Sequence, residues 1–408
     1  MRILVFLHVL TLVLLPLYIV RFNIISIPFT LLELPLLISV SATFFYVIKQ
    51  KTHFKKFRTF FDIPLFFFLL SALLSLLVTP DFNGGLGIFK AYFLEPVLFF
   101  YSLVFVGRQI SSFKFIFWGL IGAVILVSGL GFIQKLTGLF IFAEHEWNQD
   151  RISAFYNSAN AVALFIGPLI PLVAVLFFSV LHGLKKSFFL FLLIFLSVIM
   201  FWTRSKGGML AEIFSLGVIL YGLLCFKFQK LKKLWVVVPV LFVAMSVAFF
   251  VQVYALYNPL IEGNGTRIED DTLQIRYATW LSTTHILSNS VVLGTGLNGF
   301  KYTYDNYKLM NFEEDFQYPH TIVFNFWTET GLLGLTSFIT LLLYCFFVCL
   351  QLNRKRMNYL SLGLIGAFSY IVIHGLVDVP YFKNDLAVQF WSLVAITQLL
   401  KDQVKERI

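Results

Sequence analysis

The chain has 408 residues, of which 59% are hydrophobic and only 13% are charged. A soluble domain is about half apolar and about one quarter charged, so this composition excludes a soluble globular protein and indicates an integral membrane protein. A net charge of +10 would favour nucleic-acid binding in a soluble protein. Here the excess cations lie in short loops between apolar runs, which is the pattern of membrane topology.

Apolar runs recur along the chain, and a spanning helix needs about 20 mostly apolar residues. The first run follows Arg2 and has no small-residue cleavage motif before Arg21, so we expect a retained helix rather than a signal peptide. The sequence predicts an all-α integral membrane protein, with residues 1–408 forming a single polytopic domain. About twelve spans are expected, near residues 3–20, 24–48, 62–79, 91–107, 113–134, 158–181, 187–203, 208–226, 234–256, 320–350, 358–378 and 386–400.

The distribution of lysine and arginine predicts the orientation. If Met1 is inside and the spans alternate, the inside loops carry 20 of the 31 cations, which agrees with the positive-inside rule. Both termini are then cytoplasmic. A long polar loop, 257–319, lies between the ninth and tenth predicted helices on the opposite side, which in a bacterium is the periplasm or outer surface.

Two patterns raise the question of a metal site. Cys345 and Cys349 are four residues apart, but no histidine accompanies them, so buried apolar thiols are the better interpretation, as for Cys225. The acidic triplets Glu269–Asp271 and Glu313–Asp315 are of a kind that can bind divalent cations, although adjacent acids on loops are more often only solvated. We therefore expect no metal, no cofactor and no disulfide framework.

Arginines on the outer side are candidate anion ligands. Arg204 lies in the short turn Thr203–Gly208, near the edge of the hydrocarbon, and Gly207 and Gly208 would let backbone approach a ligand. Arg276 lies in a stretch whose apolar residues follow helical spacing, which predicts an amphipathic helix at the interface. Each guanidinium either snorkels to the interface or binds an anion such as phosphate through its planar fork of donors.

His320 follows Pro319 at the start of the tenth predicted helix. A neutral imidazole can take a proton from a hydroxyl group, although a lone histidine is often only a satisfied polar group. Glu329 lies nine residues further along the same helix. A carboxylate at that depth is either functional or an anchor for a neighbouring helix.

Four polar stretches follow one another in order between residues 85 and 385. They are Arg151–Phe155 with Asn157 and Asn160, then Thr203–Gly208, then Arg276–Trp280 with Gly294–Asn298, and then Pro319–Thr321 with Trp327–Gly334, followed later by His374–Asp378. In order, spacing and topology they resemble the O-antigen ligase and polymerase superfamily of bacterial membrane glycan transferases. The chain departs from that family at Thr321, where an asparagine is common.

The resemblance implies a GT-C-like membrane fold and a glycan donor linked to undecaprenyl diphosphate. In a ligase the glycan moves to a lipid A–core sugar hydroxyl at the periplasmic face. Carried over by motif, His320 would activate the acceptor hydroxyl, and Arg204 and Arg276 would bind the diphosphate. The supporting residues would be Arg151, Asn160, Lys206, Trp280 and Glu329.

This scheme predicts an inverting, metal-independent glycosyltransferase of the inner membrane, because two guanidinium groups would stabilise the leaving diphosphate. One alternative is an O-antigen or exopolysaccharide polymerase that joins lipid-linked repeat units. Another is a non-enzymatic flippase for lipid-linked saccharides, which would be expected to carry cations deep in the bundle rather than at its outer face. The expected partners are the glycan donor, the glycan acceptor and membrane lipids, and not nucleic acid.

Overall fold

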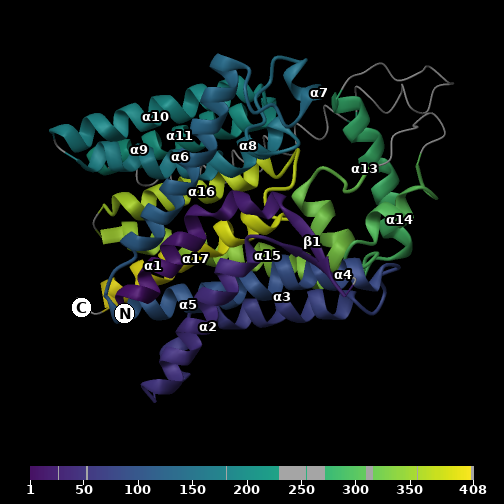
Figure 1. The fold of residues 1–408 in the computed structure, drawn as a ribbon, viewed down its shortest axis with the longest axis horizontal. Coiled ribbons are helices and arrows are strands. Elements are labelled where there is room, and N and C mark those ends of the chain that lie inside the picture. The colour runs from purple at the N-terminus through teal and green to yellow at the C-terminus, as the bar shows by residue number, and fades with distance from the viewer. Residues whose placement is uncertain are drawn as a thin grey trace.

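The computed structural model describes residues 1–25, 27–51, 54–180, 182–228, 254, 272–308, 316–355 and 357–405. Helices packed side by side form the body of the molecule (Figure 1). The two chain termini lie together at one end of the bundle, whereas helices α13 (Thr272–Asn289) and α14 (Phe300–Tyr304) lie at the other end. The end with α13 and α14 also holds the candidate site.

Six helical segments in the described part of the chain are long and apolar enough to cross a membrane. They are α4–η3–α5 (Phe82–Ile88, Phe89–Leu94 and Glu95–Gln109), α6 (Lys114–Thr137), α8–η4–α9 (Ala159–Ile166, Gly167–Leu169 and Ile170–Ser179), α10 (Leu184–Thr203), α11 (Lys206–Lys227) and most of α15 (Ile322–Lys355). Shorter apolar helices are α1 (Arg2–Val13), α3 (Asp62–Ser75) and α16 (Tyr359–His374). The remaining helices are η1 (Leu15–Ile19), α2 (Glu33–Lys49), η2 (Phe54–Phe57), α7 (Glu144–Trp147) and α17 (Asn384–Lys405).

The helical membrane architecture expected from the sequence is confirmed, but the count of about twelve spans is not. Each predicted span except 234–256 overlaps a helix of the structure. The segment 234–256 lies outside the described residues apart from Tyr254. The same holds for residues 257–271 and 309–315 of the predicted outer loop, which include both acidic triplets.

The predicted helix 24–48 is wrong over its first third. Strand β1 (Arg21–Ile24) pairs antiparallel with β2 (Ile27–Thr30), and Arg21 lies opposite Thr30. The segment is rich in aromatic and β-branched residues, which favour strands, and Pro28 disfavours a helix interior. Helix α2 therefore begins only at Glu33, and the protein is not purely α-helical.

Helix α17 is the centre of the bundle. Its side chains from Asn384 to Leu400 are buried on every side, which explains why it lacks an amphipathic pattern. Within α17, the Trp391 indole donates to the hydroxyl of Tyr381, which lies just before the helix (3.0 Å). The Tyr381 hydroxyl in turn donates to the Tyr92 carbonyl (2.7 Å). These bonds fix the turn between α16 and α17, where several site residues lie.

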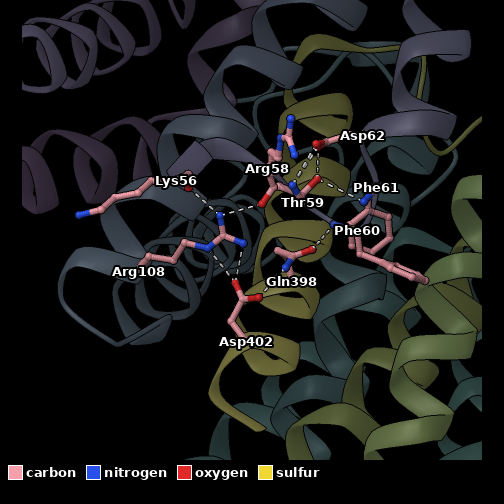
Figure 2. A network of polar contacts seen from close by, with 9 residues as sticks. All are labelled: Lys56, Arg58, Thr59, Phe60, Phe61, Asp62, Arg108, Gln398 and Asp402. Atoms are coloured by element: carbon pink, nitrogen blue, oxygen red, sulfur yellow. Dashed lines mark hydrogen bonds and ion pairs between the residues drawn. The ribbon is translucent and has the colours of Figure 1, made fainter. Parts of the chain in front are cut away.

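A polar network ties the chain together at the end where the termini lie (Figure 2). Arg108 at the end of α5 donates to the Asp402 carboxylate (2.8 Å) and to the Lys56 and Arg58 carbonyls (2.7 and 2.9 Å). Gln398 bridges the same carboxylate to the amide of Phe60. The network therefore joins the segment before α3 to α5 and α17, far from the candidate site.

Helix α15 is broken at Gly331, which has a φ of 68°. A side chain there would overlap the Val292 carbonyl oxygen, so the close approach of a loop requires glycine at this position. Just before the break in the sequence, the Glu329 carboxylate accepts from the backbone amide of Asn298 (2.6 Å). The Thr328 carbonyl accepts from the backbone amide of Thr295 (2.7 Å). The loop 291–299 is thereby held against α15.

Candidate functional site

His320 lies where three separate parts of the chain meet. The Ile322 amide just after it donates to the Gly375 carbonyl (2.8 Å), which joins the start of α15 to the end of α16. The carbonyl of Pro319 just before it accepts from the Trp280 indole of α13 (3.0 Å). The tertiary structure therefore holds the His320 backbone from both sides.

The His320 residue itself has two unusual features. Its φ of 53° is in the left-handed region, which costs a residue with a side chain about 1–2 kcal/mol. Its ring packs against Phe316 and Tyr318, with ring centroids 5.5 and 4.4 Å away. Its Nδ1 atom is buried and has no hydrogen-bond partner among the described residues. A strained backbone and a free buried nitrogen are typical of a functional side chain.

Charged side chains surround this histidine. The charges of Asp378, Arg276 and Lys383 all act on the imidazole. The main effect is burial, which lowers the pKa of His320 from 6.5 to about 4; Asp378 raises it, and Arg276 and Lys383 lower it further. The imidazole is therefore neutral at pH 7 and is able to accept a proton.

The Asp378 carboxylate is the negative charge of this group. Burial alone would raise its pKa, but His320, His374, Arg276 and Lys383 outweigh that effect and hold the pKa below its usual value. Its Oδ1 atom also accepts from the Val379 amide (2.8 Å). Asp378 is therefore ionised and fixed in place.

Asp378 does not form an ion pair with either of the two nearby cations. Arg276 and Lys383 form no ion pair with any residue that the structure describes. Both side chains remain partly accessible, so the group can meet a ligand. Cations that are close to a half-buried histidine and lack a paired carboxylate are suited to binding an anion.

The turn that carries Arg204 reaches the same region through its glycine. A Cβ at Gly207 would lie 3.2 Å from the Cδ2 atom of His374, so the start of α11 packs against the end of α16. His374 in turn shares a hydrogen bond with the Tyr370 hydroxyl (3.1 Å), which donates to the Ala163 carbonyl. The close approach at Gly207 is thus a helix contact in this structure.

Arg204 itself points elsewhere. Its side chain is 58% exposed and forms an ion pair with Asp150, which also pairs with Lys135. Like His320, Arg204 has a left-handed backbone, with a φ of 52°. Within the described residues it has no hydrogen bond or ion pair to the group around His320. Its guanidinium marks a second cationic position at this end of the bundle.

Arg151 and Asn160 have extensive contacts within the protein. The Arg151 guanidinium donates to the Thr203 carbonyl (2.9 Å) and to the Asn160 side chain (2.8 Å), and it pairs with Glu146 (2.8 Å). These bonds connect the loop before α8 to the end of α10. Their effect is to position the turn that bears Arg204.

The other supporting residues fall into three different settings. Lys206, the first residue of α11, is exposed and forms no ion pair with a described residue. Trp280 is buried and holds the Pro319 carbonyl, as described above. Glu329 is buried and accepts from the backbone amide of Asn298 in the loop 291–299.

The structure therefore brings His320, Arg276 and Trp280 together and leaves Arg204 at a separate position. It also adds Lys383, which we did not identify from the sequence, and gives Asp378 a place beside His320. Asp378 closes the stretch His374–Asp378 noted in the sequence, whereas the only signal for Lys383 was a charged residue in a short link between apolar helices. Nothing in the sequence indicated that this link folds against His320.

Comparison with protein families agrees with the resemblance seen in the sequence. Residues 189–339 match a family model described as O-Antigen ligase, so this part of the chain is similar to that family and supports the superfamily to which the motifs point. The match includes Arg204, Arg276 and His320. It supports an enzyme of the membrane glycosyltransferase kind in general. No curated protein matches the chain.

Proposed function

We propose that this chain transfers a glycan from undecaprenyl diphosphate to a sugar hydroxyl of lipid A–core, at the periplasmic face of a bacterial inner membrane. The observation that carries the proposal is that the Arg276 charge acts on the neutral ring of His320. Within the described residues, the buried His320 Nδ1 atom has no hydrogen-bond partner and Arg276 has no ion pair. The family match to residues 189–339 supports the class of substrate. The GT-C-like fold and the cytoplasmic termini are part of the same proposal.

The reaction follows from what each group does. The acceptor oxygen forms a bond to the anomeric carbon while the bond from that carbon to the diphosphate oxygen breaks. His320 takes the proton from the acceptor hydroxyl, and the electron pair of the broken bond stays on the diphosphate. Arg276 stabilises the charge that grows on the leaving oxygen, with Arg204 binding the same diphosphate from the second cationic position.

A single displacement of this kind inverts the configuration at the anomeric carbon. The guanidinium groups provide the positive charge that a divalent cation would otherwise supply, so the scheme requires no metal. The negative charge of Asp378 partly offsets the positive charges of Arg276 and Lys383 that act on His320. Trp280 acts as a positioning residue through the Pro319 carbonyl.

The test uses single substitutions in cells that lack the native gene. His320→Ala and Arg276→Gln should each lower the amount of glycan attached to lipid A–core about 100-fold or more, because each removes a group acting in the transition state. Arg58→Gln, an exposed arginine at the opposite end of the bundle, is the matched control and should leave the glycan profile unchanged. Normal glycan profiles in both site variants would contradict the proposal.

The same experiment separates the ligase from the polymerase. A ligase that fails leaves long lipid-linked chains, whereas a polymerase that fails leaves single lipid-linked repeats. The donor chemistry is common to both reactions, so His320 and Arg276 have the same roles in each. A product that retains the donor configuration would contradict the single displacement.

A further inference from the structure

We infer that Lys383 and Arg21 form a second anion site, which binds a phosphate group on the acceptor saccharide. The site would lie where the β1–β2 hairpin meets the start of α17. The inference rests on the proposed function, because it concerns the second substrate of the same reaction. It assigns a substrate class to residues outside the group of His320 and Arg276.

The β-hairpin brings Arg21 to the start of α17. Arg21 is the first residue of β1 and lies opposite Thr30 of β2. The Thr30 hydroxyl accepts from the side-chain amide of Asn384 (2.9 Å), and Asn384 directly follows Lys383. One hydrogen bond and one strand pair thus connect the two cations.

The position of Lys383 is fixed from other sides as well. The Tyr381 hydroxyl donates to the Tyr92 carbonyl (2.7 Å), and the Phe382 ring packs edge-on against the Tyr92 ring, with centroids 6.4 Å apart. On the far side, the Tyr156 hydroxyl donates to the Asp385 carboxylate (3.1 Å). The link 381–385 is therefore held by three separate elements, so Lys383 is not a freely moving surface lysine.

Arg21 and Lys383 are close enough for their charges to act on each other. Neither forms an ion pair with a residue in the described ranges. Burial lowers the pKa of Lys383 and Arg21 lowers it further, although Asp378 and Asp385 act in the opposite direction. Two neighbouring cations of this kind are stabilised by an added anion.

The nearby carboxyl group of Asp385 does not fully neutralise Arg21 and Lys383, so an added anion would still stabilise them. Burial raises the pKa of Asp385 to about 7, against the opposing effects of Lys383 and its hydrogen bonds, so at neutral pH it is only partly ionised. Asp378 lies on the side of His320 and has a lowered pKa, and the Glu33 carboxylate, which accepts from the Asn384 side chain, is already paired with Lys90. The Arg21 side of Lys383 therefore keeps a positive charge.

Uncharged polar groups around this cation pair favour a sugar phosphate over a bare ion. The Asn384 Oδ1 atom is buried without a hydrogen-bond partner among the described residues. The Tyr18 ring lies 6.0 Å from the Arg21 guanidinium carbon, and the Tyr92 ring lies in the same region. Amide oxygens bind sugar hydroxyls, and aromatic rings provide an apolar face for the sugar ring, while the cations bind the phosphate.

Lys383 is the charge that the proposed second anion site shares with the surroundings of His320. Arg276 and Lys383 both act on the imidazole, whereas Arg21 acts on Lys383 and Tyr92. A donor diphosphate at Arg276 and an acceptor phosphate at Arg21 and Lys383 would leave the acceptor hydroxyl near the base. The geometry thus points to an acceptor that carries phosphate close to the hydroxyl that reacts.

The test measures how many equivalents of inorganic pyrophosphate, labelled with ³²P, bind to the purified full-length protein in detergent micelles. The wild-type protein should bind two equivalents. Lys383→Gln and Arg21→Gln should each lower the affinity for one of the two equivalents about tenfold or more, since each removes a charged hydrogen-bond donor. Arg276→Gln should weaken the other equivalent. Arg58→Gln is the matched control and should bind two, and Lys383→Arg should retain binding.

The outcomes separate this inference from the proposed function. A single equivalent that is lost in Arg276→Gln and kept in Arg21→Gln would overturn the second site and leave the proposed function in place. A single equivalent weakened by all three substitutions would also overturn it. If Arg276→Gln keeps two equivalents while Arg21→Gln loses one, the second site stands and the diphosphate role of Arg276 fails. Since Arg21 is exposed, its variant also guards against misfolding of Lys383→Gln.

Competition then identifies the source of the acceptor phosphate. Glucose 6-phosphate should displace the second equivalent if the phosphate is carried on a core sugar. Farnesyl diphosphate should displace both equivalents if the acceptor is itself linked to a lipid diphosphate. Displacement of neither equivalent by either compound would overturn the assignment to a saccharide phosphate.

Discussion

The backbone at His320 is the residue-scale feature on which the site depends. A left-handed conformation at a histidine persists only where the surrounding structure requires it. Here the requirement comes from Trp280 on one side and from the Gly375 carbonyl on the other. The ring is thereby kept among charges that act on it in opposite directions.

These charges predict the titration of His320. Its pKa should lie near 4, so the ring is neutral from about pH 5 upward and gains a proton as the pH falls through 4. Lys383→Gln removes a positive charge and should move the pKa upward, whereas Asp378→Asn removes the negative charge and should move it downward.

NMR of the protein labelled at its histidine ring carbons measures this titration, and His320→Gln identifies the signal among the seven histidines. His145, which is exposed, provides an internal reference. A His320 signal that titrates near 6.5, as an exposed imidazole does, would show that the ring is not enclosed as described.

At the scale of elements, the break in α15 positions the loop beside the site. The helical geometry is interrupted at Gly331, where glycine is required because the Val292 carbonyl occupies the space that a side chain would need. The last turn before the break provides Glu329 and the Thr328 carbonyl as acceptors for loop amides. The same helix therefore presents His320 at its start and anchors the loop 291–299 one to three turns later.

Gly331→Ala should accordingly be strongly destabilising. The substitution adds a side chain to a left-handed position, at about 1–2 kcal/mol, and adds overlap with the Val292 carbonyl. Thermal unfolding of the purified protein in detergent measures the loss. Gly129→Ala in α6 is the matched control: nothing lies within 4 Å of its added methyl group, so the midpoint should be unchanged or higher. Equal midpoints for both variants would contradict the described break.

At the scale of the whole molecule, the two ends of the bundle have different roles. The end that holds the termini is closed by the network of Arg108, Asp402 and Gln398 (Figure 2). The opposite end gathers α13, the start of α15 and the hairpin around the turn before α17 (Figure 1). Charge at the end of the termini therefore stabilises the fold, whereas at the opposite end Arg276 and Lys383 have no ion pair within the described residues.

Arg108→Ala tests this division. Loss of its bonds to Asp402 and two carbonyls should lower the free energy of unfolding by about 1–3 kcal/mol. Because the network is remote from the site, pyrophosphate binding below the unfolding temperature should be unchanged. Arg58→Ala, whose contribution to the network is its backbone carbonyl, should be near neutral. A loss of binding in Arg108→Ala without loss of stability would contradict the division.

The sequence by itself determined the membrane class and most helix positions, and it proposed His320, Arg204 and Arg276 as site residues, because hydrophobic runs and polar motifs are local patterns. It did not predict the hairpin, because its apolar residues matched a span by composition, although Pro28 and the β-branched residues favour strands.

Only the tertiary structure decided which polar residues meet. It separated Arg204 from His320 by pairing the former with Asp150, and it placed Asp378 and Lys383 beside His320. These contacts join segments more than 50 residues apart, through helix packing and hydrogen bonds such as that from Ile322 to Gly375. Long-range packing of this kind leaves no periodic signal in a single sequence, because it depends on how whole helices fit together.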